Sequence, residues 1–378
     1  MPVRTFDVIV VGGGVIGGSI ALQLAQSKLR VVILDRGDPG REASWAAAGM
    51  LSPAPDSPSS IPLVPFGRAS LSLYPQFIAD IEEIVGRELD LREDGAIEVF
   101  FSADAERQLS TLVALHRGLG LPTEPLPVDE ARKLEPALGR EVCAAAWMPY
   151  ERSIDPQILT SSVLDAARLS GVEVIPNSSV TRIAEENGRC SGINVNGETF
   201  SAGQVVLAAG AFSEMIEGVK PRPAVRPIRG QMVCLSGDVR MGQVLRSERG
   251  YVVPREPGND SQQIVAGSTL EDVGFEKRVT PAGLDQICSA AIEMVPALAG
   301  TEVVRTWCGL RPDTPDHLPL LGPSELPGLT IATGHYRNGI LLTPITAKLV
   351  REWITEQRVS MDWQVLSPMR FSEAKSAQ

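Results

Sequence analysis

The sequence predicts an α/β protein of two domains, in which a domain built on a βαβ unit is interrupted by a second, α+β domain that carries an antiparallel sheet. A glycine-rich turn joins a β-branched strand to a helix near residue 12. The regular βαβ alternation stops near residue 66, and a strand-rich region begins near residue 226. The 378 residues, of which 43% are hydrophobic, are enough for two cores.

The composition favours a globular protein with an acidic surface. The chain has 35 Lys and Arg against 46 Asp and Glu, a formal net charge of −11. Such a charge repels phosphate backbones and anionic lipid, so we expect no nucleic-acid partner. The five cysteines form no CxxC pair, and the three histidines form no zinc-type cluster. We therefore expect no structural metal and a reducing compartment, the cytoplasm.

The apolar N-terminal stretch could be mistaken for a signal peptide. Asp7 and a run of glycines interrupt it, however, and no A-x-A cleavage site follows. Elsewhere no apolar stretch approaches the roughly 18 residues that a membrane-spanning helix needs. The sequence thus predicts no membrane span.

The first βαβ unit predicts a Rossmann-like nucleotide site. Residues 6–11 form a β-branched run typical of a buried parallel strand, and three glycines follow it in G-x-G-x-x-G spacing: Gly12, Gly14 and Gly17. A helix (IGGSIALQLAQ) and a second strand (RVVILD) come next, and Asp35 stands about 20 residues after the first glycine, where a carboxylate binds an adenosine ribose. A glycine-rich turn without ligand is the alternative, and the motif alone leaves FAD and NAD open.

Two later stretches favour FAD. In REASWAAAGML the small residues 46–49 would let the backbone lie against a flat ring or a diphosphate, although a tightly packed helical turn would look the same. GQVVLAAGAFS is a strand that closes on Ala208, Ala209 and Gly210, like the strand and turn that flavoproteins place beside the nucleotide.

The remaining segments suggest how the domains are divided. A Pro/Ser-rich connector covers 54–65, and helical spacing is seen at 71–85, 103–119, 155–170 and 281–294, with Asp155 as N-cap. Strands are expected at 96–101, 172–175, 180–185, 190–195 and 204–207, and in QMVCL, GYVVP and QQIVAG. We assign 1–65, 151–225 and 306–367 to the nucleotide domain and 66–150 and 226–305 to the substrate domain, and expect a mobile tail at 368–378.

The segment GHYRNGILLTPITAKL places cations, an amide and a glycine just ahead of an apolar helix. Backbone N–H groups at a helix start attract an electron-rich partner, and Arg337 and Asn338 add donors there. The alternative is an ordinary helix start with an exposed Arg337.

These motifs resemble the FAD-dependent amine and amino-acid oxidases of the D-amino-acid oxidase type, and the resemblance covers nearly the whole chain. It rests on VIVVGGGVIGGSIA, ASWAAAGML, PIRGQ, GYVVPRE, WCGLRPDTPDHLPLLG and GHYRNGILLTPITAKL, in matching order and spacing. It implies oxidative deamination of glycine and other small amines, and an FAD site formed by Gly12, Gly14, Val15, Ile16, Gly17, Asp35, Arg36, Ser44, Ala47, Ala48, Gly49, Met50, Val180, Ala209, Gly210, Arg311, His335, Tyr336, Arg337, Asn338, Gly339 and Ile340.

The resemblance also implies substrate-binding roles. Arg311 would bind the substrate carboxylate with its planar fork, Tyr251 would bind the same carboxylate, and Arg337 would be a second cation. Leu270 and His335 would line the pocket, although Leu270 could equally be an ordinary core leucine. The Gly339 and Ile340 N–H groups would face the flavin edge that becomes anionic on reduction.

The implied chemistry needs no protein base. A neutral amine passes a hydride from Cα to flavin N5, the imine is hydrolysed or handed on to thiazole synthesis, and O2 is reduced to H2O2. In agreement, the sequence indicates no acid–base pair for His116, His317 or His335. The resemblance implies a small amine and O2 as partners and a homo-oligomer, specifically a tetramer.

Cys308 departs from the expected pattern and keeps other functions open. It lies near the position where sarcosine oxidases tether their flavin covalently, although a buried free thiol with non-covalent FAD is the simpler interpretation. The alternatives are an oxidase of sarcosine or other N-methyl amines, a D-amino-acid dehydrogenase that reduces a quinone, an NAD-dependent dehydrogenase, and a protein that uses FAD only structurally.

Overall fold

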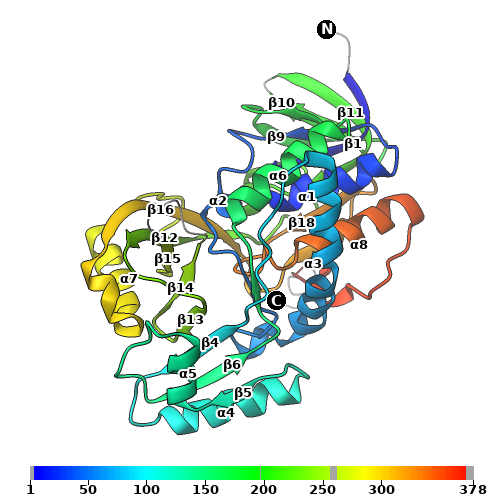
Figure 1. Ribbon diagram of the computed structural model, residues 1–378. Coiled ribbons are helices and arrows are strands. Elements are labelled where there is room, and N and C mark those ends of the chain that lie inside the picture. Colours follow the sequence, from blue (N-terminus) through cyan, green and yellow to red (C-terminus); the bar gives the residue numbers. More distant parts are fainter. Residues whose placement is uncertain (1–3, 196, 256–261, 372–378) are drawn as a thin grey trace.

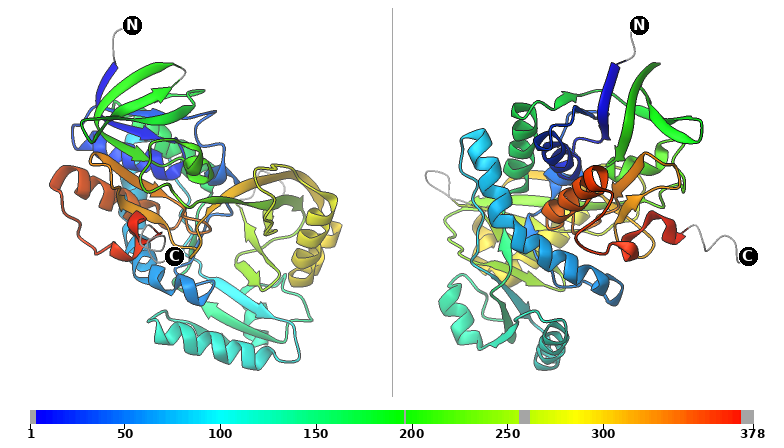
Figure 2. Two further views of the ribbon diagram at one scale, coloured as in Figure 1. Left: turned by 180° about the vertical axis from the view of Figure 1, so that it is seen from behind. Right: turned by 90° about the vertical axis from the view of Figure 1, so that its right-hand side faces the viewer.

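The computed structural model describes residues 4–195, 197–255 and 262–371 and contains two large sheets that occupy different ends of the molecule (Figure 1, Figure 2). The first sheet has the strand order β17 (Leu320–Pro323), β18 (Leu329–Thr333), β11 (Glu198–Leu207), β1 (Arg4–Val11), β2 (Val31–Leu34) and β8 (Glu173–Ile175), with β10 (Arg189–Val195) and β9 (Val180–Glu186) extending from β11. β1 runs parallel to both β2 and β11, so the carboxyl ends of these three strands meet at one edge.

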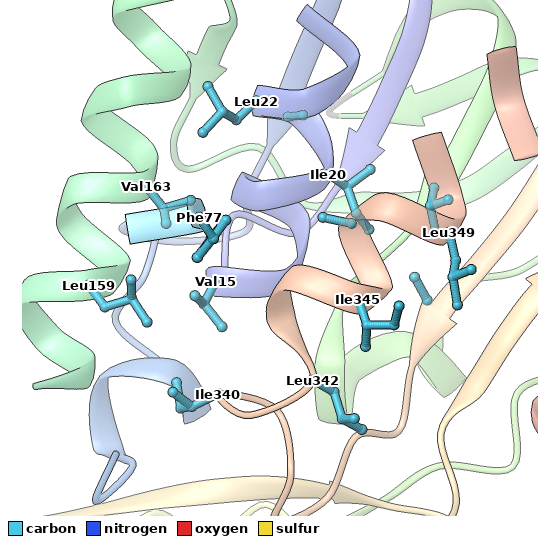
Figure 3. Packing of buried hydrophobic residues seen from close by; sticks show 14 of the residues in the cluster. Val15, Ile20, Leu22, Phe77, Leu159, Val163, Ile340, Leu342, Ile345 and Leu349 are labelled. Atoms are coloured by element: carbon cyan, nitrogen blue, oxygen red, sulfur yellow. The ribbon is translucent and has the colours of Figure 1, made fainter. Parts of the chain in front are cut away.

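Both faces of the first sheet are buried, which explains the unbroken apolar run in β1. Val8 and Val10 face a core formed with α1 (Val15–Gln26), α3 (Val64–Val85), α6 (Pro156–Leu169) and α8 (Thr343–Glu356). Ile9 and Val11 face a second core that the β9–β10 hairpin covers. Figure 3 shows the first core, where Val15 and Ile20 of α1 lie between Leu159 of α6 and Ile345 of α8. The α1 helix is therefore fixed directly behind the glycine turn.

The second sheet has the strand order β16 (Glu302–Asp313), β12 (Arg226–Gly237), β15 (Gln262–Gly267), β14 (Gly250–Pro254), β13 (Val244–Ser247), β4 (Ala96–Phe100), β6 (Ala144–Met148) and β5 (Glu124–Leu126). One face packs on α7 (Pro281–Met294), with α4 (Ala105–Gly118) and α5 (Val128–Leu134) near β4 to β6. The other face carries Met232, Tyr251 and Trp307 and packs against the segment around Ala46.

Shorter elements complete the chain. A two-stranded pair joins β3 (Met50–Leu51) to β7 (Arg152–Ser153), and α2 covers Ala43–Ala46. The described residues also form the 3-10 turns η1 (Pro58–Leu63), η2 (Gly210–Met215), η3 (Pro296–Gly300), η4 (Gln364–Leu366) and η5 (Pro368–Phe371). Within the described ranges no helix is long and apolar enough to cross a membrane.

The two sheets divide the chain differently from the predicted boundaries in two places. The helix α3 was predicted to belong to the substrate domain, but Tyr74 and Phe77 are buried against α6 and α8 in the first core, because its apolar face finds its partners there. The strand β16 stays paired with β12 as far as Asp313, beyond the predicted boundary at 306. Of the predicted mobile tail, 368–371 form η5, where Arg370 bonds to Asp316, and 372–378 lie outside the described residues.

Candidate active site

An elongated pocket lies between the two sheets. The carboxyl ends of β1 and β2, the α2 segment and the turn after β11 form one wall, and β12, β14 and β16 form the other. Of the predicted cofactor and substrate residues, these line it: Gly12, Gly14, Val15, Ile16, Asp35, Arg36, Ser44, Ala47, Ala48, Gly49, Met50, Val180, Ala209, Gly210, Tyr251, Arg311, His335, Tyr336, Arg337, Gly339 and Ile340. Gly17, Leu270 and Asn338 are not among the lining residues.

The glycine turn has the geometry that a dinucleotide site requires. Gly12 has a φ of +106°, and a Cβ built on it would lie 2.4 Å from the carbonyl oxygen of Ala208. A Cβ on Gly17 would lie 1.9 Å from the carbonyl oxygen of Gly12. Gly17 therefore acts from outside the pocket, because it lets α1 pack closely on the turn.

The start of α1 is free to hold an anion. Gly14 is the N-cap and offers no side-chain cap, and the first turn contains no acidic residue. The Val15 N–H donates to Ser44 Oγ at 3.0 Å, which fixes the α2 segment beside the turn. A helix N-terminus arranged in this way suits the pyrophosphate of a dinucleotide.

Asp35 lines the pocket with a carboxylate that two backbone N–H groups hold in place. Its Oδ2 accepts the Gly13 N–H at 2.7 Å and its Oδ1 accepts the Gly37 N–H at 2.9 Å. Each carboxylate oxygen has more than one lone pair, so both can accept a further bond from a hydroxyl in the pocket. Together with the open start of α1, these contacts fit the adenosine half of FAD.

Nearby, Arg36 lies over the ring of Phe212 with its guanidinium carbon 3.7 Å from the ring centroid, and Phe212 in turn stacks on Phe275 at 5.1 Å.

The turn before α8 presents backbone donors to the other half of the pocket. The regular helix begins only at Thr343, later than the sequence suggested, because Leu342 N–H bonds to Asn338 O at 2.9 Å and closes a separate turn first. Gly339 and Ile340 lie in this turn and line the pocket, and no group in the described part of the chain accepts their N–H. From α3, Ser70 Oγ donates to Leu341 O at 2.6 Å and Tyr74 donates to Ile340 O, which fixes the turn.

Arg311 and Tyr251 meet in this part of the pocket. The Arg311 guanidinium donates to Ser268 Oγ at 2.7 Å and to Thr269 O at 3.2 Å, and it lies across Gly230, where a Cβ would be 2.1 Å from Nη1. Desolvation lowers the pKa of Arg311, but a guanidinium stays charged at any physiological pH. These contacts use two of its five N–H donors and a further hydrogen bond joins it to Tyr251, so donors remain for a carboxylate.

Arg337 and Leu270 are placed differently from Arg311. Arg337 is partly exposed and pairs with Asp56 at 3.4 Å while lining the pocket, so it lies at the rim. The Leu270 side chain is 63% exposed and contributes nothing to the lining, so its role as a pocket wall stays a prediction.

His335 is buried beside the pocket, and its Nε2 lies 3.1 Å from Thr346 Oγ1. Burial lowers its pKa to about 4, so the imidazole is neutral at pH 7.

Acid should therefore destabilise the fold through His335. The pKa of His335 in the folded state, about 4, lies below its ordinary value of 6.5. As the pH falls, the ring is therefore protonated in the unfolded state before it is protonated in the folded state. The stability that the neutral ring contributes is complete above about pH 6.5, and up to about 3 kcal/mol is lost as the pH falls to about 4. We expect His335→Gln to reduce the fall in Tm between pH 7 and pH 4.5, measured by calorimetry of the holoenzyme; a pH dependence identical to wild type would contradict this.

The position of Cys308 argues against a covalent flavin. In the register of β12 and β16, Gly230 is opposite Gly309 and Gln231 is opposite Cys308. Paired residues point to the same face, so Cys308 lies on the face of Gln231, opposite to the pocket face that carries Gly309 and Arg311. Burial also raises the pKa of this thiol, so it is not a reactive thiolate.

The expectation that no histidine forms an acid–base pair is wrong for His317. Its Nδ1 lies 2.6 Å from Oδ1 of the buried Asp313, and its ring stacks on Tyr336 at 5.2 Å. The spacing along the chain does not indicate this pair, because the two side chains meet through a turn in which His317 has a φ of +63°.

The sequence also missed several lining residues, among them Ser178, Phe212, Gly230, Met232, Ser268 and Gly309. Glycine inside a strand often marks a close approach of another group, so Gly230 and Gly309 could have been found by that signal.

The chain is similar to known proteins over nearly its whole length. A family model described as FAD dependent oxidoreductase (DAO) matches residues 7–353. A "Glycine oxidase" of Geobacillus kaustophilus is 34% identical over 363 residues, which cover 94% of this chain and 95% of that protein. The crystal structure of glycine oxidase from the same species superimposes with a TM-score of 0.90 at 32% identity, covering 97% of this chain and 99% of that one.

A "Bifunctional protein ThiO/ThiG" of Synechocystis is 33% identical over 375 residues, 97% of this chain but only 54% of that protein. The chain therefore spans about half the length of these bifunctional relatives.

Proposed function

This chain belongs to the family of FAD-dependent oxidoreductases, and we propose that it oxidises glycine and other small amino acids and amines. The substrate loses a hydride from Cα and becomes an imine, whose hydrolysis yields the oxo acid and ammonia, while O2 is reduced to H2O2. The observation that carries the proposal is the charged Arg311 guanidinium, which keeps free donors beside Tyr251 in the same pocket as the glycine turn.

The residues of the chain supply binding and orientation. FAD, when bound, accepts the hydride and returns two electrons to O2. Arg311 would hold the substrate carboxylate through a bidentate pair, with Tyr251 beside it. The N–H groups of Gly339 and Ile340, which have no acceptor among the described residues, would stabilise negative charge that develops on the adjoining ring.

The substrate assay separates this function from its alternatives. We expect the purified protein to be yellow, to release its flavin into the supernatant on acid precipitation, and to produce H2O2 with glycine. Sarcosine, D-alanine and D-proline complete the panel. Flavin that stays in the precipitate with sarcosine as the preferred substrate would support a sarcosine-type oxidase. Bleaching of the flavin without H2O2 would indicate a dehydrogenase.

We also propose that the glycine imine is passed to thiazole synthesis in the thiamine pathway. The likeness to the bifunctional ThiO/ThiG relative, of which this chain matches about half, supports this role. Expression of the chain in a bacterium whose own glycine oxidase is deleted should restore growth without thiamine. Failure to restore growth by an active enzyme would argue against this role.

The assembly and the location of the protein are further parts of the proposal. We propose a homotetramer, as the family resemblance of the sequence implies, and a location in the cytoplasm, which the five cysteines without a CxxC pair favour. Light scattering should give about four times the 40.5 kDa mass of one chain, and a single-chain mass would contradict the assembly. Fractionation of the native host tests the location.

A further inference from the structure

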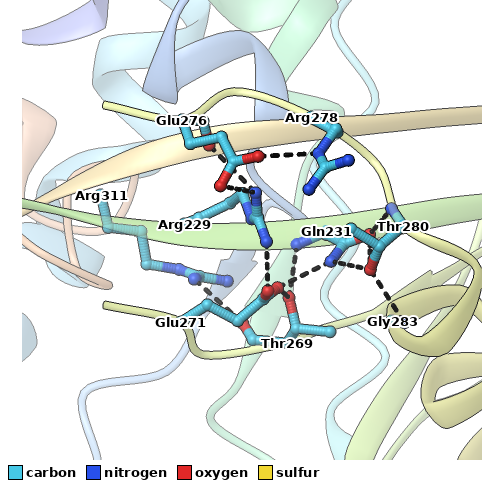
Figure 4. A network of polar contacts seen from close by, with 9 residues as sticks. All are labelled: Arg229, Gln231, Thr269, Glu271, Glu276, Arg278, Thr280, Gly283 and Arg311. Carbon is cyan, nitrogen blue, oxygen red and sulfur yellow. Dashed lines mark hydrogen bonds and ion pairs between the residues drawn. The ribbon is translucent and has the colours of Figure 1, made fainter. Parts of the chain in front are cut away.

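Behind Arg311 lies a group of buried and half-buried polar residues for which the proposed chemistry has no role (Figure 4). We call it the Glu271 cluster; its members are Arg229, Gln231, Thr269, Glu271 and Thr280. We propose that Glu271 is a positioning residue that acts through Thr269 to hold the Arg311 guanidinium in the direction needed to bind a carboxylate, an inference that rests on the proposed function.

The first link joins Arg311 to the segment 268–269. Arg311 lies near the end of β16 and lines the pocket, and its two hydrogen bonds to this segment, to Ser268 Oγ and to Thr269 O, orient the planar head group. A guanidinium presents its donors in one plane, so a rotation of the head group would misdirect the remaining donors. The direction of Arg311 therefore depends on where the segment 268–269 lies.

The second link fixes this segment to β12. Thr269 Oγ1 accepts the Gln231 N–H at 2.9 Å and donates to Glu271 Oε1, and Thr269 is buried. The backbones of Arg229 and Glu271 exchange two hydrogen bonds, at 2.9 and 3.0 Å. The Gln231 Nε2 also donates to Glu271 Oε1, at 2.7 Å. Glu271 thus joins the side chains of Thr269 and Gln231 at one oxygen.

The third link is the charge of Glu271. Burial by itself would raise its pKa, but hydrogen bonds from Arg229, Thr269 and Gln231 outweigh this and bring it to about 2. Its second oxygen receives the buried Arg229 guanidinium. A carboxylate accepts from all three donors at once, whereas the amide of a glutamine has only one oxygen to offer.

The alternation of β12 separates the support from the site. Arg229 and Gln231 point to the far face of the sheet, and Gly230 between them leaves room for Arg311 on the pocket face. The cluster holds the segment 268–271 from behind without entering the pocket, since none of its five members lines it. This arrangement is what a positioning role requires.

A purely structural role is the competing explanation. Gln231 Oε1 accepts the Thr280 N–H at 2.7 Å, and Thr280 caps α7 through the Gly283 N–H at 3.2 Å. If the cluster served only to hold α7, its loss would lower Tm without a selective effect on carboxylate ligands.

The test uses Glu271→Gln in the holoenzyme, with Glu276→Gln as its matched control. Glu276 also approaches Arg229, at 3.6 Å, but no contact joins it to Thr269. The Kd of glycolate is measured by the change that glycolate causes in the flavin absorbance. We expect this Kd to rise on the order of ten-fold in Glu271→Gln, because a misdirected Arg311 would weaken a charged hydrogen bond to the carboxylate. The Kd of FAD should stay within about two-fold of wild type, and Glu276→Gln should bind glycolate normally.

Kinetics with two substrates complete the test. In Glu271→Gln the KM for glycine should rise with the glycolate Kd, while kcat/KM for glycine ethyl ester, which has no free carboxylate, should stay unchanged. An equal loss for both substrates, or an unchanged glycolate Kd, would overturn the inference. The glycolate titration needs no turnover, so it tests the role of Glu271 even if the enzyme oxidises neither glycine nor its ethyl ester. Absence of oxidation would reject the proposed function but not the role of Glu271.

Two variants of Thr269 guard against misfolding of Glu271→Gln. Thr269→Val removes the hydroxyl that joins Glu271 to the Gln231 N–H and should weaken glycolate binding. Thr269→Ser keeps the hydroxyl and should bind glycolate as tightly as the wild type. Equal glycolate affinity in these two variants would contradict the proposed path.

Discussion

Replacing Arg311 by methionine is expected to lower kcat/KM for glycine by about two to three orders of magnitude, while FAD stays bound. Methionine keeps the length of the side chain but loses the charge and the donors. Removal of one partner of a desolvated, hydrogen-bonded charge pair costs about 2–5 kcal/mol. Arg311→Lys should recover only part of the loss, because an ammonium cannot form the planar pair. Steady-state kinetics and flavin titration measure both effects.

Arg337 provides the control for this experiment. It lines the same pocket, but it is partly exposed and already paired with Asp56. Exposed pairs contribute about 0–1 kcal/mol, so Arg337→Met should lower kcat/KM by less than about ten-fold. A larger loss in Arg337→Met than in Arg311→Met would show that the rim cation, and not Arg311, binds the carboxylate.

Replacing Gly12 by alanine should abolish FAD binding. The new Cβ would lie 2.4 Å from the Ala208 carbonyl oxygen, and the φ of +106° is strained for any residue with a Cβ. The obstacle is backbone and cannot rotate away, so the turn must move from the place where the pyrophosphate would lie. The variant should purify colourless or with a flavin content below about one tenth of wild type, as absorbance at 450 nm and a flavin titration would show.

Gly37→Ala is the matched control for Gly12→Ala. Gly37 lies two residues after Asp35 and donates its N–H to that carboxylate, but a Cβ there would meet no atom within 4 Å. Its flavin content should equal that of wild type. If both variants lost flavin alike, steric conflict with Ala208 would not be the cause.

Local signals in the sequence were sufficient to predict the βαβ unit around the glycine turn. The spacing of Gly12, Gly14 and Gly17 depends on neighbours along the chain, and so does the cap at Asp155, which accepts the N–H of Gln157 and Ile158 in the structure. The predicted strands at 6–11 and 96–101 appear as β1 and β4. Strand β6, with the alanine-rich sequence AAAWM, was missed because a run of alanines favours helix as readily as strand.

The start of α8 marks the limit of local signals. Cations, an amide and a glycine ahead of an apolar run suggested that the helix follows them directly, yet a separate turn closes first and the helix begins at Thr343. The turn is fixed by Ser70 and Tyr74 of α3, more than 260 residues away along the chain. Contacts at that separation leave no local trace in the sequence.

By itself the sequence determined the βαβ motif with its glycine turn and the order of most elements, because these depend on residue type and on spacing within a few positions. Only the tertiary structure decided which face each strand residue occupies. It turned Cys308 away from the pocket and placed Glu271 behind Arg311. The physical reason is that strand register is set by pairing between distant segments, and a shift of one residue would exchange the two faces.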